Sequence, residues 1–290
     1  MHTKAFPYIG LLGFFWGTNL VAARFGVGEF QPFMFIALRL SLAAVCFAPF
    51  MVTGGRTFPT DWGTWGRSIV SGILGVAIPM SAFILSLQFM SSGLVSIFVT
   101  AAPALIALAA HFFLPEEKLN GVKWLGVGLA LLGSIFLTLL GESGLADVSR
   151  VNPLGPLMIL IGLLSDSANT VFVRLRMREM DSYHVTGIRL ITGAVLVTAA
   201  MLIFTTPELA GITGKGYFSL LYATFIGAVG GQFMAFYITR RFGAVSFSLV
   251  SFVVPIVATF FGVVLLGEIV TWGMGIGVLF IAGGIYYINR

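Results

Sequence analysis

Charged side chains interrupt three of the long apolar runs in this sequence, at Asp166, Arg39 and Arg189. A charge in the middle of a membrane-spanning helix costs about 2.5–3.5 kcal/mol on insertion scales, so such residues commonly have a partner or a function. A carboxylate at that depth carries a proton or binds an ammonium group, whereas a guanidinium binds a carboxylate or another anion. These residues are the first candidates for chemistry.

Each of them also has a structural interpretation. Arg39 and Arg189 lie 150 positions apart and form a repeated pair. For this pair we favour a structural role, in which the guanidinium caps a neighbouring helix end or reaches the membrane interface, over anion binding. Asp166 has no repeat partner. A function as proton carrier or as counter-ion of a substrate ammonium is as well supported for it as a hydrogen bond to a polar neighbour or a pairing with an arginine.

Uncharged polar and aromatic side chains extend the candidate set. Asn19 and Asn169 form a second repeated pair, for which a hydrogen bond between helices is the first interpretation and substrate contact the second. Gln232 lies near the middle of its apolar run, which makes it a better cavity residue than Gln88. Two aromatic side chains could stack on a substrate, although most aromatic residues of such a chain pack or anchor it at the interface. The candidate substrate-binding residues are Trp16, Asn19, Gln88, Asp166, Asn169, Gln232 and Tyr237.

The composition indicates which elements hold these residues. Of the 290 residues, 58% are hydrophobic and 9% are charged, against roughly 25% charged in a soluble domain. Such a chain cannot cover a water-facing surface with polar groups, so it is predicted to be an all-α membrane protein with hydrocarbon as its main solvent. The continuous hydrophobicity of the runs argues against a membrane barrel, which requires alternation. Ten runs are long enough to span the bilayer: 6–23, 32–52, 68–89, 93–114, 124–140, 153–173, 183–204, 217–239, 244–266 and 270–289.

The basic residues between the runs predict the orientation. Loops on the cytoplasmic side carry an excess of lysine and arginine. If the N-terminus is cytoplasmic, eleven basic residues lie inside and three outside, so we expect both termini inside and a location in the plasma (inner) membrane. The inner set is Lys4, Arg56, Arg67, Lys118, Lys123, Arg174, Arg176, Arg178, Arg240, Arg241 and Arg290, and the outer set is Arg24, Arg150 and Lys215.

An internal repeat divides the chain into two halves, 1–145 and 146–290, of five predicted helices each. A shift of 150 residues aligns Asn19, Arg24 and Arg39 with Asn169, Arg174 and Arg189. Later in the chain a shift of 152 aligns Pro103 and Glu116 with Pro255 and Glu268. Because each unit has an odd number of helices, the second copy is inverted in the membrane.

The ordered motifs resemble a known family. Phe15-Trp16-Gly17 with Asn19 and Arg24, Leu38-Arg39-Leu40, and the two Pro…Glu helix ends are similar to the EamA repeat of the drug/metabolite transporter (DMT) superfamily. The resemblance covers nearly the whole chain and implies a ten-helix basket with a central cavity. Members of that family export amino acids and other metabolites, and bacterial aromatic amino-acid exporters are among them.

The second copy departs from the first where Asp166-Ser167 replaces Trp16-Gly17. One half therefore offers an aromatic ring where the other offers a carboxylate. A cavity that holds both suits a substrate with an ammonium group and an apolar side chain, such as a neutral or aromatic amino acid.

Prolines and glycines predict where the helices bend and pack. Pro79, Pro103 and Pro255 lie inside the third, fourth and ninth runs, where each removes a helix hydrogen bond and permits a kink or hinge. The fifth and tenth runs are rich in glycine, which allows close helix contact. We interpret these glycines as packing within the chain first, and as a homodimer contact second.

Other classes of function find little support. The net charge of +5 is scattered over short loops rather than gathered into a nucleic-acid-binding stripe, and the single cysteine, Cys46, excludes an internal disulfide. There is no nucleotide-binding loop and no metal-binding motif, so we expect no cofactor, no metal and no catalytic residue.

The combined prediction is a secondary transporter that exports small metabolites, amino acids first, by alternating access. Its partners would be a small-molecule substrate and the lipid bilayer. A nucleotide-sugar-type exchanger is the second interpretation, because that family shares the superfamily. An intramembrane lipid-modifying enzyme is a third, but it needs a catalytic set at one depth, which Asp166 and His111 do not obviously form.

Overall fold

The computed structural model describes residues 5–53, 59–150 and 152–289, and these are almost entirely helical. Five membrane crossings are single uninterrupted helices of 20 to 24 residues, and two more are helices of 17 residues. They are α1 (Phe6–Glu29), α2 (Pro32–Val52), α7 (Gly121–Leu140), α8 (Leu154–Arg176), α9 (Ser182–Phe204), α12 (Val250–Leu266) and α13 (Trp272–Ile288).

The other three crossings are not single α-helices: two change to a π-helix without a break, and one is interrupted at Ala101. The third consists of α3 (Trp62–Gly72), the π-helix η3 (Ile73–Ala77) and α4 (Ile78–Ser86). The fourth consists of α5 (Ser92–Thr100) and α6 (Ala102–Phe113), and the eighth of α10 (Gly214–Tyr222), the π-helix η4 (Ala223–Gly230) and α11 (Gly231–Ser248). Eight crossings are long and apolar enough to span a bilayer in the described part of the chain, and α12 and α13 are shorter. Since about 17 residues already suffice to span the hydrocarbon core, the ten-helix prediction holds.

Two boundaries differ from the sequence prediction. Helix α1 continues past residue 23 to Glu29, because polar residues at a helix end can remain helical outside the hydrocarbon. Helix α11 continues to Ser248 and only a single residue, Leu249, separates it from α12, where the sequence predicted a connection at 240–243. A loss of hydrophobicity therefore marked the edge of the apolar layer and not the end of the helix.

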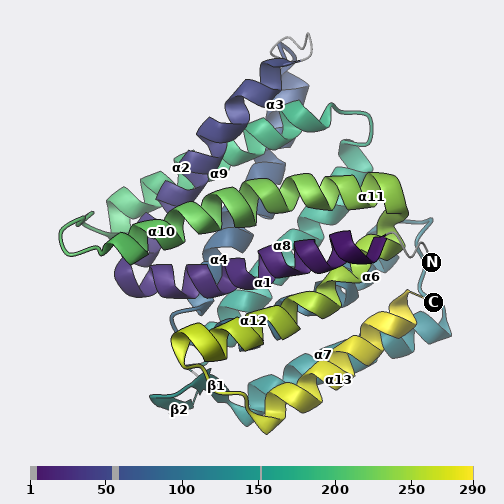
Figure 1. Cartoon of the computed structure of the whole chain (residues 1–290). Coiled ribbons are helices and arrows are strands. Elements are labelled where there is room, and N and C mark those ends of the chain that lie inside the picture. The colour runs from purple at the N-terminus through teal and green to yellow at the C-terminus, as the bar shows by residue number, and fades with distance from the viewer. Residues whose placement is uncertain (1–4, 54–58, 151, 290) are drawn as a thin grey trace.

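The two halves pack through corresponding pairs of elements (Figure 1). Helix α2 lies against α9, and α7 lies against α13, so these two pairs join equivalent helices. Other contacts recur with the halves exchanged: α1 packs on α12 and on the eighth crossing, while α8 packs on α6 and on the third crossing. This exchange is what a pseudo-two-fold axis between two inverted repeats produces.

Small residues let α1 approach α12 closely. A Cβ at Gly17 would lie 2.6 Å from the Val257 Cβ, and a Cβ at Gly13 would lie 2.5 Å from the Val253 Cβ. Both distances are too short for a real side chain, so only glycine permits this helix spacing. The residue that precedes Gly17 is Trp16, whose position along α1 is thereby fixed against the second half.

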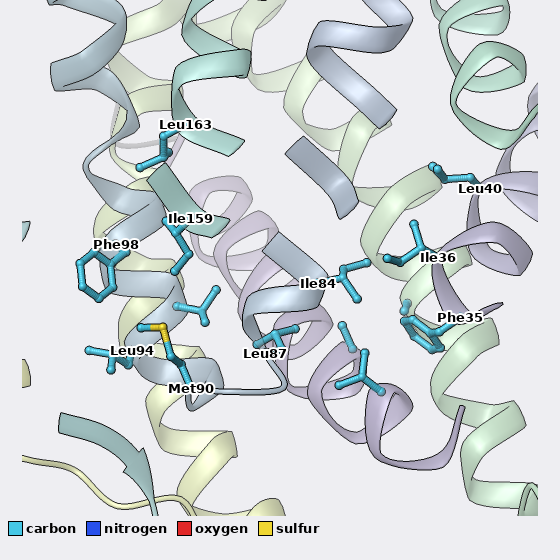
Figure 2. Close-up of a cluster of buried hydrophobic side chains, with 14 of the residues drawn as sticks. Phe35, Ile36, Leu40, Ile84, Leu87, Met90, Leu94, Phe98, Ile159 and Leu163 are labelled. Atoms are coloured by element: carbon cyan, nitrogen blue, oxygen red, sulfur yellow. The ribbon is translucent and has the colours of Figure 1, made fainter. Parts of the chain in front are cut away.

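The centre of the molecule is an apolar cluster shared by both halves (Figure 2). Helix α2 contributes Phe35, Ile36 and Leu40, and the end of the third crossing contributes Ile84 and Leu87. Side chains of α5 and α8 complete it, among them Leu94, Phe98, Ile159 and Leu163. Because this cluster fills the space between crossings of different halves, it fixes the polar residues of α1, α2, α8 and α9 relative to one another.

The predicted kink prolines lie at three kinds of position. Pro79 is in the first turn of α4, directly after η3, and Pro103 is in the first turn of α6, after a break at Ala101. Pro103 is tolerated because an N–H in the first turn of a helix has no partner within the helix. Pro79 lies in a helix that is continuous with η3, so there the π-helix directly precedes the proline. Pro255 lies inside α12, as does Pro49 inside α2, which the sequence analysis did not single out.

A short hairpin closes one end of the molecule. Strands β1 (Glu142–Leu145) and β2 (Val148–Arg150) pair antiparallel in the linker between the halves, where the sequence predicted only a loop. The Ser91 N–H donates to the Ser143 carbonyl over 2.9 Å, and the Ile269 N–H donates to the Gly144 carbonyl over 2.9 Å. The hairpin thus ties together the connections before α5 and after α12, at the end opposite the start of α1 and the end of α13 (Figure 1).

The glycines of α7 and α13 are used within the chain. A Cβ at Gly126 would lie 2.6 Å from the Gly284 carbonyl oxygen, and a Cβ at Gly277 would lie 2.6 Å from Leu137. Gly128 and Gly283 have open space beside them. A homodimer through these two helices stays a prediction.

Candidate functional site

The first polar cluster joins α1, α2 and η4. Arg39 is only 3% exposed, and its Nη2 donates to Asn19 Oδ1 over 3.1 Å. Asn19 lies directly on Gly227 of η4, where any Cβ would overlap the asparagine side chain. The π-helix η4 of the second half therefore contacts an arginine–asparagine pair of the first half.

The second cluster repeats this arrangement with the halves exchanged. Asn169 of α8 is 5% exposed and lies on Gly75 of η3, and its Oδ1 accepts a hydrogen bond of 2.6 Å from the Ser71 hydroxyl. Arg189 of α9 donates from Nη2 to the Gly75 carbonyl over 3.5 Å. A second serine, Ser165, donates to the neighbouring carbonyl of Leu74 over 2.7 Å. Carbonyls of the π-helix are thus bonded by side chains of the opposite half.

The two clusters differ in charge. Asp166, one turn before Asn169 on α8, interacts electrostatically with Arg189, although no oxygen of it lies within 4.0 Å of the guanidinium among the described contacts. The equivalent position on α1 is Trp16, which lies against Gly231 and packs edge to face on Phe247 with ring centroids 5.9 Å apart. One guanidinium therefore has a carboxylate nearby, and the equivalent position in the other half holds an indole in place of that carboxylate.

Three further predicted residues lie elsewhere. Gln232 follows Gly231 at the start of α11 and is exposed, so it is a neighbour of the Trp16 contact. Tyr237 is one turn further along and stacks at 5.1 Å on Tyr8, near the beginning of α1. Gln88 follows α4, where it lines a separate cavity of about 430 Å³ beside the hairpin. The structure brings Trp16, Asn19 and Asn169 to contacts between the halves. Asp166 interacts with Arg189 of its own half, and no described contact joins Gln232 or Gln88 to the two clusters.

Glu268 is a buried carboxylate at the end of the molecule that carries the hairpin. The sequence analysis identified it only as a motif residue. Glu268 is 6% exposed, and it accepts hydrogen bonds from the Ser92 N–H at 2.7 Å, the Ser92 hydroxyl at 2.8 Å and the Gly93 N–H at 3.3 Å. A carboxylate at the first turn of a helix satisfies N–H groups that have no partner within the helix. Arg24 interacts electrostatically with it, and both line a cavity of about 280 Å³.

The matching position in the first half is different. Glu116 is exposed, and its neighbour Glu117 forms an ion pair with Arg174 at the opposite end of the molecule. The repeat alone could have suggested that Glu268 and Glu116 share a role. Only the structure shows that Glu268 holds a helix start. Among the described residues no group of three metal-ligating side chains is present.

Comparison with known proteins places this arrangement in a family. The EamA-like transporter family matches the chain twice, over residues 4–139 and 153–290. An uncharacterized transporter of Synechocystis sp. is 27% identical over 96% of this chain and 87% of its own length. The uncharacterized transporter YoaV of Bacillus subtilis is 28% identical over 93% and 91%, and the uncharacterized inner membrane transporter YedA of Escherichia coli is 24% identical over 87% and 80%.

A solved crystal structure supports the fold independently. It covers 99% of this chain and 96% of its own, with a TM-score of 0.66 at 22% sequence identity. The duplicated polar clusters, the exchanged helix contacts and the double family match all divide the chain into the same two related halves. The chain belongs to the EamA-like transporter family, and it is a multi-pass membrane transporter.

Proposed function

We propose that this transporter exports small metabolites from the cytoplasm, and that neutral or aromatic amino acids are its first candidate substrates. The observation that carries the proposal is the replacement of a carboxylate by an indole between two otherwise matching clusters. Asp166 suits the ammonium group of an amino acid, and Trp16 suits an apolar or aromatic side chain. The asparagines beside them offer both hydrogen-bond donors and acceptors.

Alternating access is supported by the difference between the two ends of the molecule. Glu268 holds the first turn of α5 together with the hairpin connections, whereas the equivalent Glu116 is exposed. A transporter that alternates needs two ends whose closing contacts are not made at the same time. We further propose an inner-membrane location with both termini cytoplasmic, so that the end held by Glu268 faces outward.

The test is flux in proteoliposomes with a panel of labelled amino acids and other metabolites. We expect accumulation of at least one neutral or aromatic amino acid, and Asp166→Asn should lose that flux or its dependence on pH between 5.5 and 8 while inserting normally. Transport by Asp166→Asn that matches the parent protein across this range would remove Asp166 from substrate and proton recognition.

Two other classes are separated by the same preparation. Exchange of a nucleotide sugar in place of amino-acid flux would favour the nucleotide-sugar alternative. Headgroup transfer between lipids by the purified protein would reassign it to an intramembrane enzyme.

A further inference from the structure

Arg39 is a buried charge with too few partners. Its side chain is 3% exposed, its Nε lies buried without a hydrogen-bond partner, and its one hydrogen bond goes to the neutral Asn19. No carboxylate of the described residues lies within 4.0 Å of it. A guanidinium does not lose its proton in a protein, so this charge persists at membrane depth.

Arg189 has more partners in the other half, although its Nε is also buried without a hydrogen-bond partner. Its Nη2 donates to the Gly75 carbonyl, and Asp166 supplies a negative charge nearby. At the place where Arg39 would find an equivalent carboxylate, the chain has Trp16. Both halves therefore contain the arginine, but only the second half contains the nearby carboxylate.

The charge of Arg39 can therefore be balanced by an anionic group that is not part of the described chain. A guanidinium presents its N–H groups in a planar fork that matches the two oxygens of a carboxylate, and this geometry makes arginine the preferred side chain for carboxylate recognition. Trp16 precedes Asn19 by three residues and so shares its face of α1. Trp16 and Arg39 would together provide N–H donors and no negative charge.

We propose that Arg39 binds the carboxylate of the transported molecule, and that Asp166 in the opposite half receives its ammonium group. This inference rests on the proposed export of small metabolites, and it narrows the substrate class to small zwitterions that carry both groups. The carboxylate replaces the counter-ion that the first half lacks, so the loaded site holds the positive charges of Arg39, Arg189 and the ammonium group against the negative charges of Asp166 and the carboxylate.

Ligand binding to the full chain in lipid nanodiscs tests the proposal, with phenylalanine, phenylalaninamide and phenethylamine as probes. The amide keeps the ring and the ammonium and loses only the negative charge, and the amine lacks the carboxyl group altogether. We expect the parent protein to bind the acid at least about tenfold more tightly than the amide, as charge-assisted hydrogen bonds require. In Arg39→Gln the acid and the amide should bind with equal affinity.

The ratio of the two affinities separates recognition from a merely structural role. If Arg39 only supports the fold, Arg39→Gln weakens the acid and the amide by the same factor and preserves their ratio, which overturns the proposal. Equal binding of acid and amide to the parent protein also overturns it. If Arg39→Gln does not yield folded protein, Arg39→Lys keeps the charge without the fork, and its acid-to-amide ratio should fall below that of the parent protein; an unchanged ratio in this variant again overturns the proposal.

The outcomes also separate this inference from the proposed function. Binding and flux of phenylalanine with a ratio that does not depend on Arg39 would leave amino-acid export standing and remove Arg39 from it. Absence of binding for all three probes, together with absent flux across the wider panel, would instead remove the amino-acid substrate itself.

Discussion

At the scale of single residues, Glu268 has the most demanding environment outside the two central clusters. Its carboxylate is buried and its three hydrogen bonds all go to the first turn of α5. Hydrogen bonds to a charged group contribute about 1.5–3 kcal/mol each, and a buried donor left without a partner costs about 1–3 kcal/mol. The start of α5 is therefore held by a side chain that lies 176 residues away in sequence, in addition to its local cap by Ser91.

Glu268→Ala should lower the melting temperature of the detergent-solubilised protein, because the N–H groups of Ser92 and Gly93 lose their acceptor. The expected loss is about 2–4 kcal/mol in the free energy of unfolding. The stability of Glu268→Gln should lie between that of Glu268→Ala and that of the parent protein. Thermal unfolding measured by fluorescence-detected size exclusion gives the comparison. Glu116→Ala is the matched control, since Glu116 holds the same repeat position and is exposed. Equal melting temperatures for the two alanine variants would contradict the role of Glu268.

Sequence analysis found the central residues but not their partners. The cost of polar groups in hydrocarbon singled out Asp166, Asn19 and Asn169. The structure places both asparagines against π-helices of the opposite half, and Asp166 near an arginine of its own half. Their described partners lie on other crossings, so no local spacing could reveal them. Gln88 shows the limit of the same argument, because an amide near the end of an apolar run can belong to a surface cavity.

At the scale of elements, the two π-helices are the parts that connect the clusters. A π-helix turn shifts carbonyls away from their regular partners, and in η3 the carbonyls of Leu74 and Gly75 instead accept from Ser165 and Arg189. Glycine is required where these segments touch the asparagines. The hydrophobic pattern cannot predict a π-helix, because a run that is apolar on all sides shows no period at all.

The positions of the two contact glycines explain why the repeat gave no hint of them. Gly75 and Gly227 are 152 residues apart, whereas the asparagines that they contact, Asn19 and Asn169, are 150 apart. The contact glycine is the third residue of the first π-helix and the fifth residue of the longer second one, so the equivalent contact falls two positions later. An alignment at constant shift therefore pairs Gly75 with Phe225 and hides the relation.

Gly227→Ala should destabilise the protein by about 1–3 kcal/mol, because the new methyl group overlaps Asn19 as far as its Cβ and forces α1 away from η4. Gly75→Ala should cost less, since its overlaps are with the ends of the Asn169 and Arg189 side chains. Gly128→Ala in α7 has open space and should stabilise by about 0.5–1 kcal/mol. Chemical unfolding of the three variants provides the ranking, and a Gly227→Ala variant as stable as Gly128→Ala would be incompatible with the described contact.

At the scale of the whole molecule, the order of the crossings follows from composition, but the orientation rests on loop charge alone. We expect reporter fusions after residue 60 and after residue 290 to be active only with a cytoplasmic reporter, because the basic residues lie on that side. A fusion after Asp147, at the tip of the hairpin, should be active only with a periplasmic reporter. The reverse pattern at these three sites would show that the protein has the opposite orientation. A single discordant site would show that the number of crossings before or after that site differs from the number described.

The unequal number of charges at membrane depth has a consequence for ion permeability. The described crossings place Arg39 and Arg189 at the contacts between the halves against the single carboxylate of Asp166, so the empty site is positive whether or not that carboxylate is protonated. A positive pore interior repels small cations electrostatically, as it does in channels that exclude protons and metal ions. A carrier with this site would therefore hold back small cations while it transports its substrate.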